Sequence, residues 1–519
     1  MLINRRKCLG VFASLLAWLV PSAFSQGDGS AKRGDKNKQR RRADDDYVLP
    51  RELASFELLS LVLGRASDRS VTVSALAKET MEGYFEFGTA SGNYTRKTNL
   101  LALPAGKPVE SVFDNLQTNT EYFYRLQFRK PGESTFRERT ECYFHTQRGV
   151  GSTFTFGVQG DSHPERPQMS DPVLYARTLL SAAADKPDFY VCLGDDFSVE
   201  KIQTTNADTL AQPFTLQRPF LGLVAQSASL VLVNGNHEQA SLFNFNQTDI
   251  RHEVAVGAQN ARNTYFPTPM PDGFYTGDAE PLKSIGLLKD YYAWTWGDAL
   301  FVVLDNYWHS SAQVDGGFQG GAEGKQNRDG NKDRDWWGIT LGDAQYQWFK
   351  RTLEQSKAKY KFVFAHHVLG TGRGGIDESE LYEWGGRNKR GDWEFNQKRP
   401  GWDLPIHQLM AKHSVTIFFQ GHDHLFARQE RDGVVYQEVP NPADQGYVAY
   451  NQNSYQSGVK LPNSGHLRIS VSPEQVKVDY VRCYLPRDET NQRKSGEVAY
   501  SYTINPSGNT VVSAQGTTR

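Results

Sequence analysis

Cysteine is scarce in this chain of 519 residues, and neither sign of charge is in excess. The four cysteines are too few and too scattered for a disulfide framework, although a pair between Cys142 and Cys483 is left open. The formal net charge is −1, which favours neither nucleic acid nor a membrane surface as a partner. Composition therefore indicates only a globular protein with room for two or three domains.

Long apolar runs are absent beyond the first residues, so no transmembrane anchor is expected. At the start, basic residues at positions 5–7 precede a mostly apolar run from Leu9 to Val20. Small residues follow at the spacing of a cleavage site, so the pattern predicts a signal peptide over residues 1–25. The protein is therefore expected to be periplasmic or secreted. The pair Arg5-Arg6 also fits a twin-arginine signal. Charge and glycine dominate the next segment, which predicts a disordered linker over residues 26–50.

Residues 51–148 show the period-two alternation of short strands separated by turn residues, which predicts an all-β sandwich. The segment "EYFYRLQFR", for example, places alternate apolar side chains on one face. The segment "LQTNTEY" resembles the tyrosine corner of fibronectin type III domains, with Thr118 where proline is usual. Because no catalytic pattern occurs here, we expect a packing or positioning module.

From residue 149 onward, apolar strands alternate with helical segments such as "SDPVLYARTLLSAAA" and "LGDAQYQWFKRTLEQSK". This alternation predicts an α/β domain over residues 149–485. The segment "HLRISVSPEQVKVDYVRCYL" is expected to complete its sheet, and residues 486–519 to form a loose hairpin or tail. In α/β sheets, ligands bind at the carboxyl ends of the strands, so residues that follow strands are the first candidates for a site.

Five apolar runs end in the same kinds of polar residue. The runs are "FTFGVQGDSH", "PDFYVCLGDD", "SLVLVNGNHE", "KFVFAHHVLG" and "VTIFFQGHDH". A single ending of this kind is usually a turn, but a structural explanation of all five needs five coincidences. If the strands share one sheet, the endings converge on one rim. The residues concerned are Asp161, His163, Asp195, Asn236, His237, His366, His422 and His424.

These side chains offer carboxylate and amide oxygens and imidazole nitrogens, without thiolate. The set suits divalent Fe, Mn or Zn better than a closed structural zinc site. Without His237, these residues are seven candidate ligands, which is more than one metal takes from a protein. Two metals, in turn, need a shared carboxylate. Asp195, alone at its strand end, is the natural bridge. Two cations about 3.5–4 Å apart can activate a water and bind a phosphoryl oxygen together.

The ordered motifs Gly-Asp-x-His, Gly-Asp, Gly-Asn-His-Glu, His and Gly-His-x-His resemble the calcineurin-like metallophosphoesterases over about residues 151–485. The preceding sandwich and the long spacing to "FAHH" resemble the purple acid phosphatase branch. The resemblance implies a four-layer α/β/β/α domain with two divalent metal ions. It implies one metal held by Asp161, His163, Asp195 and His424, and another held by Asp195, Asn236, His366 and His422.

The resemblance also implies that His237 lies over the phosphate, as general acid or as a charge, oriented by a neighbouring carboxylate for which Glu238 is the candidate. One position departs from the purple enzymes, which have a metal-binding tyrosine where this chain has Ser198. His163 in turn stands where those enzymes have a non-ligand. Because an imidazole replaces a phenolate, we expect a colourless protein whose first metal is Fe(II), Mn or Zn. A strong visible tyrosinate band in metal-loaded protein would contradict this.

Two long segments, 315–338 and 370–402, interrupt the alternation, and loops of this length are usually lids or binding loops. The second mixes Arg373 and Arg387 with aromatic residues, and these arginines are candidate contacts for a phosphate ester. The alternative is a self-packed loop with solvated charges. His367 is either a substrate contact or a support for a ligand. The run "FVVLDNYWH" predicts a further strand, with Asp305 in a structural role.

The sequence thus predicts an exported, dinuclear, metal-dependent hydrolase of a small phosphate ester, with a phosphomonoesterase of the acid or alkaline type favoured. The family resemblance implies attack on phosphorus by a metal-bound hydroxide. A phosphodiesterase or a nucleotide phosphohydrolase is the alternative within the class. A non-catalytic surface-binding protein is the alternative from another class, and it is disfavoured because a scaffold has no use for Asn236 and His237 together.

Overall fold

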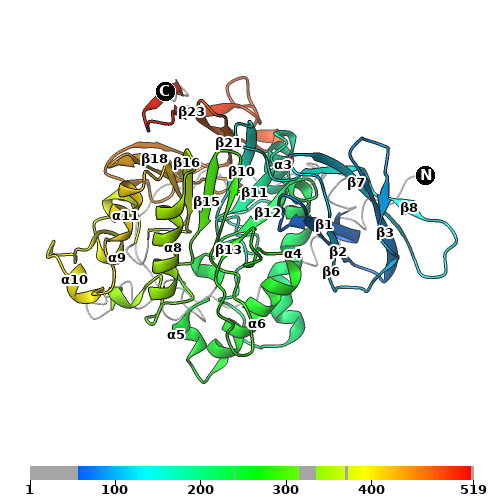
Figure 1. The fold of residues 1–519 in the computed structure, drawn as a ribbon, viewed down its shortest axis with the longest axis horizontal. Helices are drawn as coiled ribbons and strands as arrows, with labels where there is room; N and C mark the ends of the chain where they lie inside the picture. Colours follow the sequence, from blue (N-terminus) through cyan, green and yellow to red (C-terminus); the bar gives the residue numbers. More distant parts are fainter. Residues whose placement is uncertain (1–55, 239, 315–334, 369–371, 516–519) are drawn as a thin grey trace, which may run out of the picture.

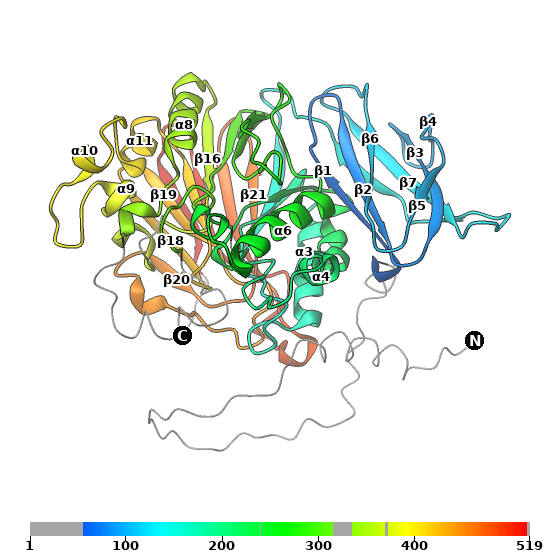
Figure 2. The same cartoon turned by 90° about the horizontal axis from the view of Figure 1, so that it is seen from below.

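The computed structural model describes residues 56–238, 240–314, 335–368 and 372–515. The predicted signal peptide and linker, and residues 315–334 of the first long segment, lie outside the described residues. The fold has an N-terminal all-β part and a larger α/β part, which lie side by side in Figures 1 and 2. Both parts of the predicted fold class are confirmed.

The N-terminal part consists of two antiparallel sheets. The first has β1 (Leu59–Gly64), β2 (Val71–Ala77) and β6 (Val109–Phe113), and the second is built on β3 (Met81–Gly88) and β7 (Glu121–Arg129). Short strands complete the second sheet: β4 (Arg96–Lys97), β5 (Leu101–Leu103), β8 (Arg137–Glu138) and β9 (Cys142–His145). Aromatic rings fill the space between the sheets, with Phe85 and Phe113 5.5 Å apart between centroids. At the predicted tyrosine corner, the Tyr122 hydroxyl accepts a hydrogen bond of 2.9 Å from the Gln117 amide.

The α/β part has a seven-stranded sheet in which three parallel strands carry the first three polar endings. These are β10 (Phe154–Gln159), β11 (Phe189–Cys192) and β12 (Ser229–Leu232). The sheet continues in antiparallel fashion with β21 (Gly465–Val471), β22 (Val476–Arg482), β23 (Val498–Ile504) and β24 (Thr510–Gln515). The hairpin expected beyond residue 485 is therefore the edge of this sheet and not a loose tail.

The eight-stranded second sheet carries the other two polar endings. Its order is β13 (Thr276–Gly277), β14 (Tyr292–Trp296), β15 (Ala299–Val303), β16 (Tyr360–Phe364), β17 (Ile417–Gln420), β19 (Val434–Glu438), β18 (Phe426–Arg431) and β20 (Val459–Leu461). Strands β15, β16, β17 and β19 are parallel neighbours. The five strands thus do not share one sheet, as the simplest interpretation of their endings assumed. They are divided between two sheets that pack face to face.

The two sheets enclose an apolar layer. Phe156 of β10 lies 5.3 Å from Phe301 of β15 and 5.3 Å from Phe362 of β16, measured between ring centroids. Helices cover the outer faces, so the four-layer arrangement is confirmed (Figure 2). The seven-stranded sheet is covered by α3 (Pro172–Ala184), α4 (Ala207–Ala225) and α6 (Ile250–Tyr265). The eight-stranded sheet is covered by α8 (Asp343–Gln355) and α11 (Ile406–Lys412), with the short helices α9 (Tyr382–Gly385) and α10 (Phe395–Lys398) beside them.

Helix α4 joins the two parts of the molecule. The fully buried guanidinium of Arg218 donates to the Ser60 hydroxyl on β1 at 3.2 Å and to the Ser74 carbonyl on β2 at 2.8 Å. The Tyr124 hydroxyl of β7 donates to the Gln226 carbonyl at the end of α4, at 2.6 Å. Because buried polar groups need such partners, these bonds fix the sandwich against the α/β part.

Cys142, Cys192 and Cys483 are free and buried, so Cys142 and Cys483 do not pair. Of the described helices, none is both long enough and apolar enough to cross a bilayer.

Candidate metal centre

The polar residues that follow the five strands meet in one place. Asp161 and His163 follow β10, Asp195 follows β11, and Asn236 and His237 lie in the 3-10 turn η1 (Asn236–Glu238) after β12. His366 follows β16, and the pair His422 and His424 follows β17. All eight side chains are buried, and three groups of them bring carboxylate and imidazole atoms within 4.8 Å of one another. The two sheets therefore end at a common edge.

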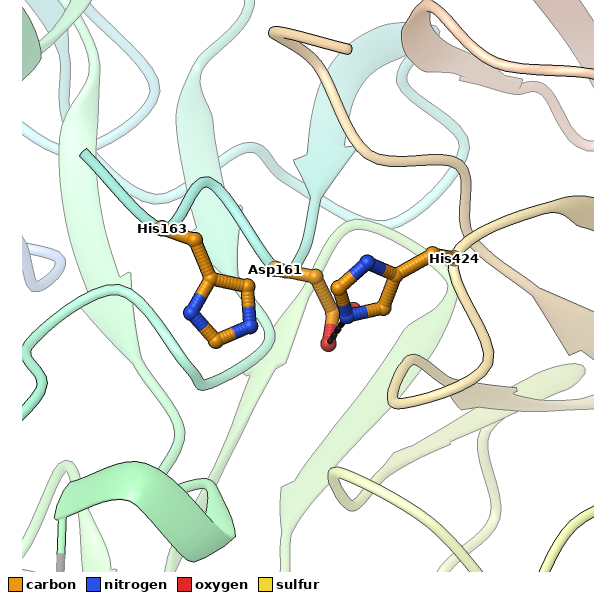
Figure 3. Close-up of side chains that lie close together, drawn as sticks. All are labelled: Asp161, His163 and His424. Carbon is orange, nitrogen blue, oxygen red and sulfur yellow. Dashed lines mark ion pairs between the residues drawn. The ribbon is translucent and has the colours of Figure 1, made fainter. Parts of the chain in front are cut away.

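The first group contains Asp161, His163 and His424. Figure 3 shows the three side chains converging from two loops, with the imidazole of His424 directed at the Asp161 carboxylate. The His424 Nε2 atom lies 3.3 Å from Asp161 Oδ1. The His163 Nε2 atom lies 3.6 Å from Asp195 Oδ2, so Asp195 borders this group.

The second group contains Asp195, His366 and His422. The His366 Nε2 atom lies 3.1 Å from Asp195 Oδ2 and 3.1 Å from Asn236 Oδ1. The His422 Nδ1 atom lies 2.9 Å from the same Asn236 oxygen. Asp195 Oδ2 thus faces both groups, which is the position that a bridging carboxylate would need.

These atoms fit divalent cations. Metal–ligand bonds of about 2.0–2.2 Å place neighbouring ligand atoms roughly 3 Å apart, as most of these atoms are. The Nε2 atom of His163 is buried and has no hydrogen-bond partner among the described residues, although it borders Asp195. A buried imidazole nitrogen without a partner is costly unless something else binds it, and a cation would do so.

Hydrogen bonds from surrounding groups orient the candidate ligands. Glu165 Oε1 lies 3.0 Å from His163 Nδ1, and the Leu193 carbonyl lies 2.9 Å from His366 Nδ1. Each acceptor keeps the proton on Nδ1 and leaves Nε2 free to face the centre, as in many metal sites. The Asp195 carboxylate is held through Oδ1 by the His237 amide at 2.9 Å, which directs Oδ2 inward.

The backbone at this edge is strained. Five of the candidate residues have positive φ although none is glycine: Asp161 (58°), His163 (40°), Asp195 (58°), His422 (77°) and His424 (53°). Left-handed backbone at non-glycine residues costs on the order of 1–3 kcal/mol each and concentrates at functional sites. The fold maintains this conformation in every loop that carries an aspartate or His-x-His candidate.

Two of the motif glycines are required by close approach. A Cβ atom on Gly235 would lie 2.3 Å from Asp195 Oδ1, and one on Gly421 would lie 2.5 Å from Asp161 Oδ2. Both distances are far shorter than van der Waals contact. The motifs therefore need glycine so that the candidate carboxylates can approach the neighbouring loops.

His237 is oriented by a carboxylate other than the expected one. Its Nδ1 atom lies 2.5 Å from Glu200 Oε2, while its Nε2 atom lies 3.8 Å from Asp195 Oδ2 at the edge of the centre. The Arg166 Nη2 atom lies 3.1 Å from both ring nitrogens of His237 and 3.1 Å from Glu200 Oε1. The prediction that Glu238 orients this ring is therefore wrong.

Glu238 instead connects two of the loops. Its carboxylate accepts hydrogen bonds from four backbone amides, those of Asp195 (3.1 Å), Asp196 (3.0 Å), Phe197 (3.0 Å) and Gly235 (2.7 Å). These bonds engage both carboxylate oxygens, Oε1 with Asp196 and Phe197 and Oε2 with Asp195 and Gly235. Burial, followed by the charge of Asp195, raises the pKa of Glu238 to about 7.

The concentration of charge shifts several pKa values. Burial alone would raise the pKa of Asp195, but the imidazoles of His366 and His237 outweigh it and hold that pKa well below its usual range. Burial opposes the charged form of His237, yet Asp195 and Glu200 raise its pKa to about 9. Burial and the nearby Arg373 charge lower the pKa of His422 well below normal. Burial likewise opposes the charged form of His366, yet Asp195 and Asp161 raise its pKa to about 10, so the centre combines buried anions with two imidazoles of raised pKa.

Of the other residues expected near the substrate, His367 and Arg373 lie beside the centre. His367 lies beside the centre, with Nδ1 2.7 Å from the Tyr307 hydroxyl and its ring stacked on that of His422 at 4.6 Å. Arg373 donates to the His422 carbonyl at 2.6 Å and to Asp423 at 2.8 Å, so it supports the His-x-His turn. These contacts favour a supporting role for both residues.

Arg387 is not brought to the centre. It lines a hollow with Arg431 and Asp432. This hollow lies at the far end of β18, whereas His424 precedes the start of that strand. Arg387 also donates to the Gly391 carbonyl at 2.8 Å.

Asp305 is structural as predicted, because its Oδ1 accepts from the Tyr307 amide at 2.7 Å and its Oδ2 from Asn234 at 2.7 Å.

Three charged residues at the centre escaped prediction from the sequence: Glu165, Arg166 and Glu200. The first two directly follow the first motif in "GDSHPER", and the third follows the second motif in "GDDFSVE". Their only signal in the sequence is their closeness to a motif. Charged residues after a turn are common on protein surfaces, so that signal is weak.

Comparison with known proteins agrees with this geometry. The model of the calcineurin-like phosphoesterase family matches residues 154–426, which is more than half of the chain. A solved structure of PhoD has a TM-score of 0.60 at 14% identity, covering 89% of this chain and 93% of that one. A purple acid phosphatase isolated from yellow lupin (Lupinus luteus) seeds has a TM-score of 0.54 at 16% identity, covering 86% of this chain and 74% of that one. At such identities these two structures show the shared fold alone.

No curated protein matches the chain. The family match, together with metal-binding groups of side chains at the edge where two sheets end, establishes the class. The chain belongs to the calcineurin-like phosphoesterase family and is a phosphoester hydrolase.

Proposed function

We propose that this chain is an exported phosphomonoesterase that works with two divalent cations, Fe, Mn or Zn. One would be held by Asp161, His163, Asp195 and His424, and the other by Asp195, Asn236, His366 and His422. The observation that carries this proposal is the position of Asp195 Oδ2, which lies 3.1 Å from His366 Nε2 in one group and 3.6 Å from His163 Nε2 in the other. The predicted signal peptide supports export.

Divalent cations bound at this centre would supply Lewis acidity at the phosphoryl group and lower the pKa of a water. The protein provides the orientation. Asp161 Oδ2 accepts a hydrogen bond of 2.9 Å from the His422 amide, and this bond holds the two loops of the first group together. His366 is fixed by the Leu193 carbonyl, so its Nε2 remains directed at Asp195.

His237 is the proton donor in this proposal. Glu200 binds its Nδ1, which leaves Nε2 directed toward the centre, and the pKa of about 9 keeps the ring protonated near neutral pH. A protonated imidazole at that place can give a proton to the departing alcohol oxygen, a step that typically contributes about 10²–10⁴-fold to the rate.

The test is metal analysis of purified protein, coupled to assays with 4-nitrophenyl phosphate and bis(4-nitrophenyl) phosphate. We expect two equivalents of metal, faster hydrolysis of the monoester, and loss of both metal and activity in Asn236→Ala. A folded N236A variant with full hydrolysis would overturn the assignment of the second group. Faster hydrolysis of the diester would favour a phosphodiesterase instead, and a wild-type protein that hydrolyses neither ester would revive a binding role.

A further inference from the structure

Arg166 stands between two carboxylates at the edge of the centre. Its Nε atom lies 3.3 Å from Glu165 Oε1, and its Nη2 atom lies 3.1 Å from Glu200 Oε1. Its backbone amide donates to the His163 carbonyl at 2.9 Å, so the residue is part of the turn that carries a candidate ligand. Because Glu165 contacts His163 and Glu200 contacts His237, Arg166 connects the first metal group to the proposed proton donor.

The guanidinium lies over the face of the His237 ring. Its Nη2 atom is 3.1 Å from Nδ1 and 3.1 Å from Nε2 of that ring. A nitrogen at equal distance from both atoms could not lie in the ring plane without colliding with the carbon between them. The Nη2 atom therefore lies out of the plane of the ring, and Nε2 also lies 3.8 Å from Asp195 Oδ2 at the centre.

One end of the guanidinium is left for a ligand. Among the described residues, the Nη1 atom of Arg166 has no hydrogen-bond or ion-pair partner, while Nε and Nη2 are both engaged. About a fifth of the side chain is exposed, compared with 7% for His237 and 2% for Asp195. Arg166 is thus a fixed cation with two free N–H groups at the open side of a buried centre, since guanidinium stays charged at all ordinary pH values.

We propose that Arg166 binds a phosphoryl oxygen of the substrate and selects phosphomonoesters over phosphodiesters; this inference rests on the proposed function. A monoester group carries three terminal oxygens and close to two negative charges near neutral pH. A diester carries two terminal oxygens and one charge, and its third oxygen bears an organic group. If two bound cations each took one phosphoryl oxygen, the third oxygen of a monoester would be left for a donor outside the metal groups. Arg166 supplies donors at that side, where the second organic group of a diester would have to fit.

The two glutamates explain why an arginine suits this role better than a lysine. The guanidinium uses two of its nitrogens to bind Glu165 and Glu200 and still has the third available. A lysine has a single nitrogen and could not hold both carboxylates while contacting a ligand. The ion pairs thus fix the direction of the free nitrogen before substrate binds, which avoids an ordering cost on binding.

The experiment measures equilibrium binding and turnover together, on metal-loaded protein at about pH 8. Binding of inorganic phosphate, which is mainly dianionic there, and of dimethyl phosphate, a monoanion, is measured by calorimetry. Turnover is measured with the monoester and diester described above. The variants are Arg166→Met and Arg166→Lys. The matched control is Arg125→Met, because Arg125 of β7 has 28% of its side chain exposed and also pairs with two glutamates, Glu86 and Glu138.

We expect R166M to weaken phosphate binding and to lower kcat/KM for the monoester by about 10- to 100-fold, the range of a hydrogen bond between charged groups. Binding of dimethyl phosphate and kcat/KM for the diester should change by less than about threefold, within the error of independent effects. R166K should fall between wild type and R166M, and R125M should match wild type. Metal content is measured for each variant, because Arg166 touches the glutamate that orients His163.

An equal loss for both anions would overturn the proposal and show that Arg166 only positions His237. No loss for either anion would overturn it as well. If R166M does not fold, binding of phosphate and of dimethyl phosphate is compared in R166K instead. An equal loss for both anions in R166K, or no loss for either, would then overturn the proposal. A wild-type protein that binds phosphate selectively through Arg166 but hydrolyses no ester would contradict the proposed function and leave this inference supported.

Discussion

At the scale of single residues, Glu200 has the most direct influence on the proposed proton donor. Its Oε2 atom lies 2.5 Å from His237 Nδ1, and it is buried with only 8% of its side chain exposed. Burial opposes protonation of the ring, but Asp195 and Glu200 together raise the pKa of His237 to about 9. The ring thus keeps its proton over the pH range in which most enzymes work.

Replacing Glu200 by Gln should shift the pH profile. The substitution removes one of the two anions that raise the pKa of His237, so the ring will lose its proton at lower pH. Because the acid form is the active one, the alkaline limb of kcat/KM should move to lower pH by about one to two units. The profile is measured with a phosphomonoester between pH 5 and 10.

Glu165→Gln is the matched control, since Glu165 is the other carboxylate that contacts Arg166. It binds His163 and not His237, so E165Q should reduce metal content while leaving the alkaline limb in place. An E200Q profile that coincides with that of wild type would show that His237 is not the titrating acid.

The residues that the sequence predicts at the centre are those that belong to motifs after strands. Asp161, Asp195 and His424 are recognisable because a glycine turn and an apolar run precede each of them. Glu200 and Arg166 are not, because their importance comes from a contact across two loops that no local pattern records. The positive φ values of the motif residues are likewise a property of the folded loops, because this conformation is uncommon for any non-glycine residue, although aspartate and histidine adopt it more often than most.

At the scale of elements, α4 determines how the N-terminal sandwich is held. Arg218, in the middle of this helix, is fully buried, and burial lowers its pKa to about 9. Besides its bonds to the sandwich it donates to the Tyr265 carbonyl at the end of α6, at 2.8 Å. One side chain therefore joins a helix of the α/β part to a second helix and to two strands of the sandwich.

Substitution of Arg218 by Met should destabilise the protein by about 2–4 kcal/mol. The change keeps most of the side-chain volume but leaves the Ser74 and Tyr265 carbonyls without this donor, at about 1–3 kcal/mol for each unsatisfied buried group. The free energy of unfolding is measured in urea. R125M, which removes partly exposed ion pairs, should cost less than about 1 kcal/mol. Equal stability of R218M and R125M would contradict the role of Arg218 as a link between the parts.

The elements themselves were predictable, but their division between sheets was not. Each of the five runs is a strand, because continuous apolar stretches of this length are typical of strands buried on both faces. The same pattern arises whether a strand is covered by helices or by a second sheet. The contact of Phe156 with Phe301 and Phe362 decides for a second sheet, and sequence spacing contains no record of it.

At the scale of the whole molecule, the centre is the place where the two sheets are joined at one edge. The Gly421 amide donates to the His366 carbonyl at 2.7 Å, and the Asp161 amide donates to the Gly194 carbonyl at 2.9 Å, each within one sheet. Contacts between the sheets are made by side chains, such as His366 with Asp195. Without cations, the pairing of these side chains relies on imidazoles that carry protons, and burial makes such charges costly.

Removal of metal should therefore lower the stability of the entire α/β part. Each site that binds metal only in the folded state contributes about 2.7 kcal/mol when free metal is a hundredfold above Kd. Two sites would contribute roughly 5 kcal/mol, which should lower Tm by several degrees after treatment with a chelator. The melting curve is followed by calorimetry before treatment, after treatment, and after metal is restored.

Asp195→Asn separates this effect from non-specific action of the chelator. The variant keeps the shape of the side chain but loses the charge that both groups share, so it should bind little metal, and its Tm should respond neither to chelator nor to added metal. If the wild-type protein melts at the same temperature with and without metal, while metal analysis shows that the ions have left, the cations do not join the two sheets. The edge would then be held by the hydrogen bonds of Glu238 and the loop glycines, and the strained residues would owe their conformation to the protein alone.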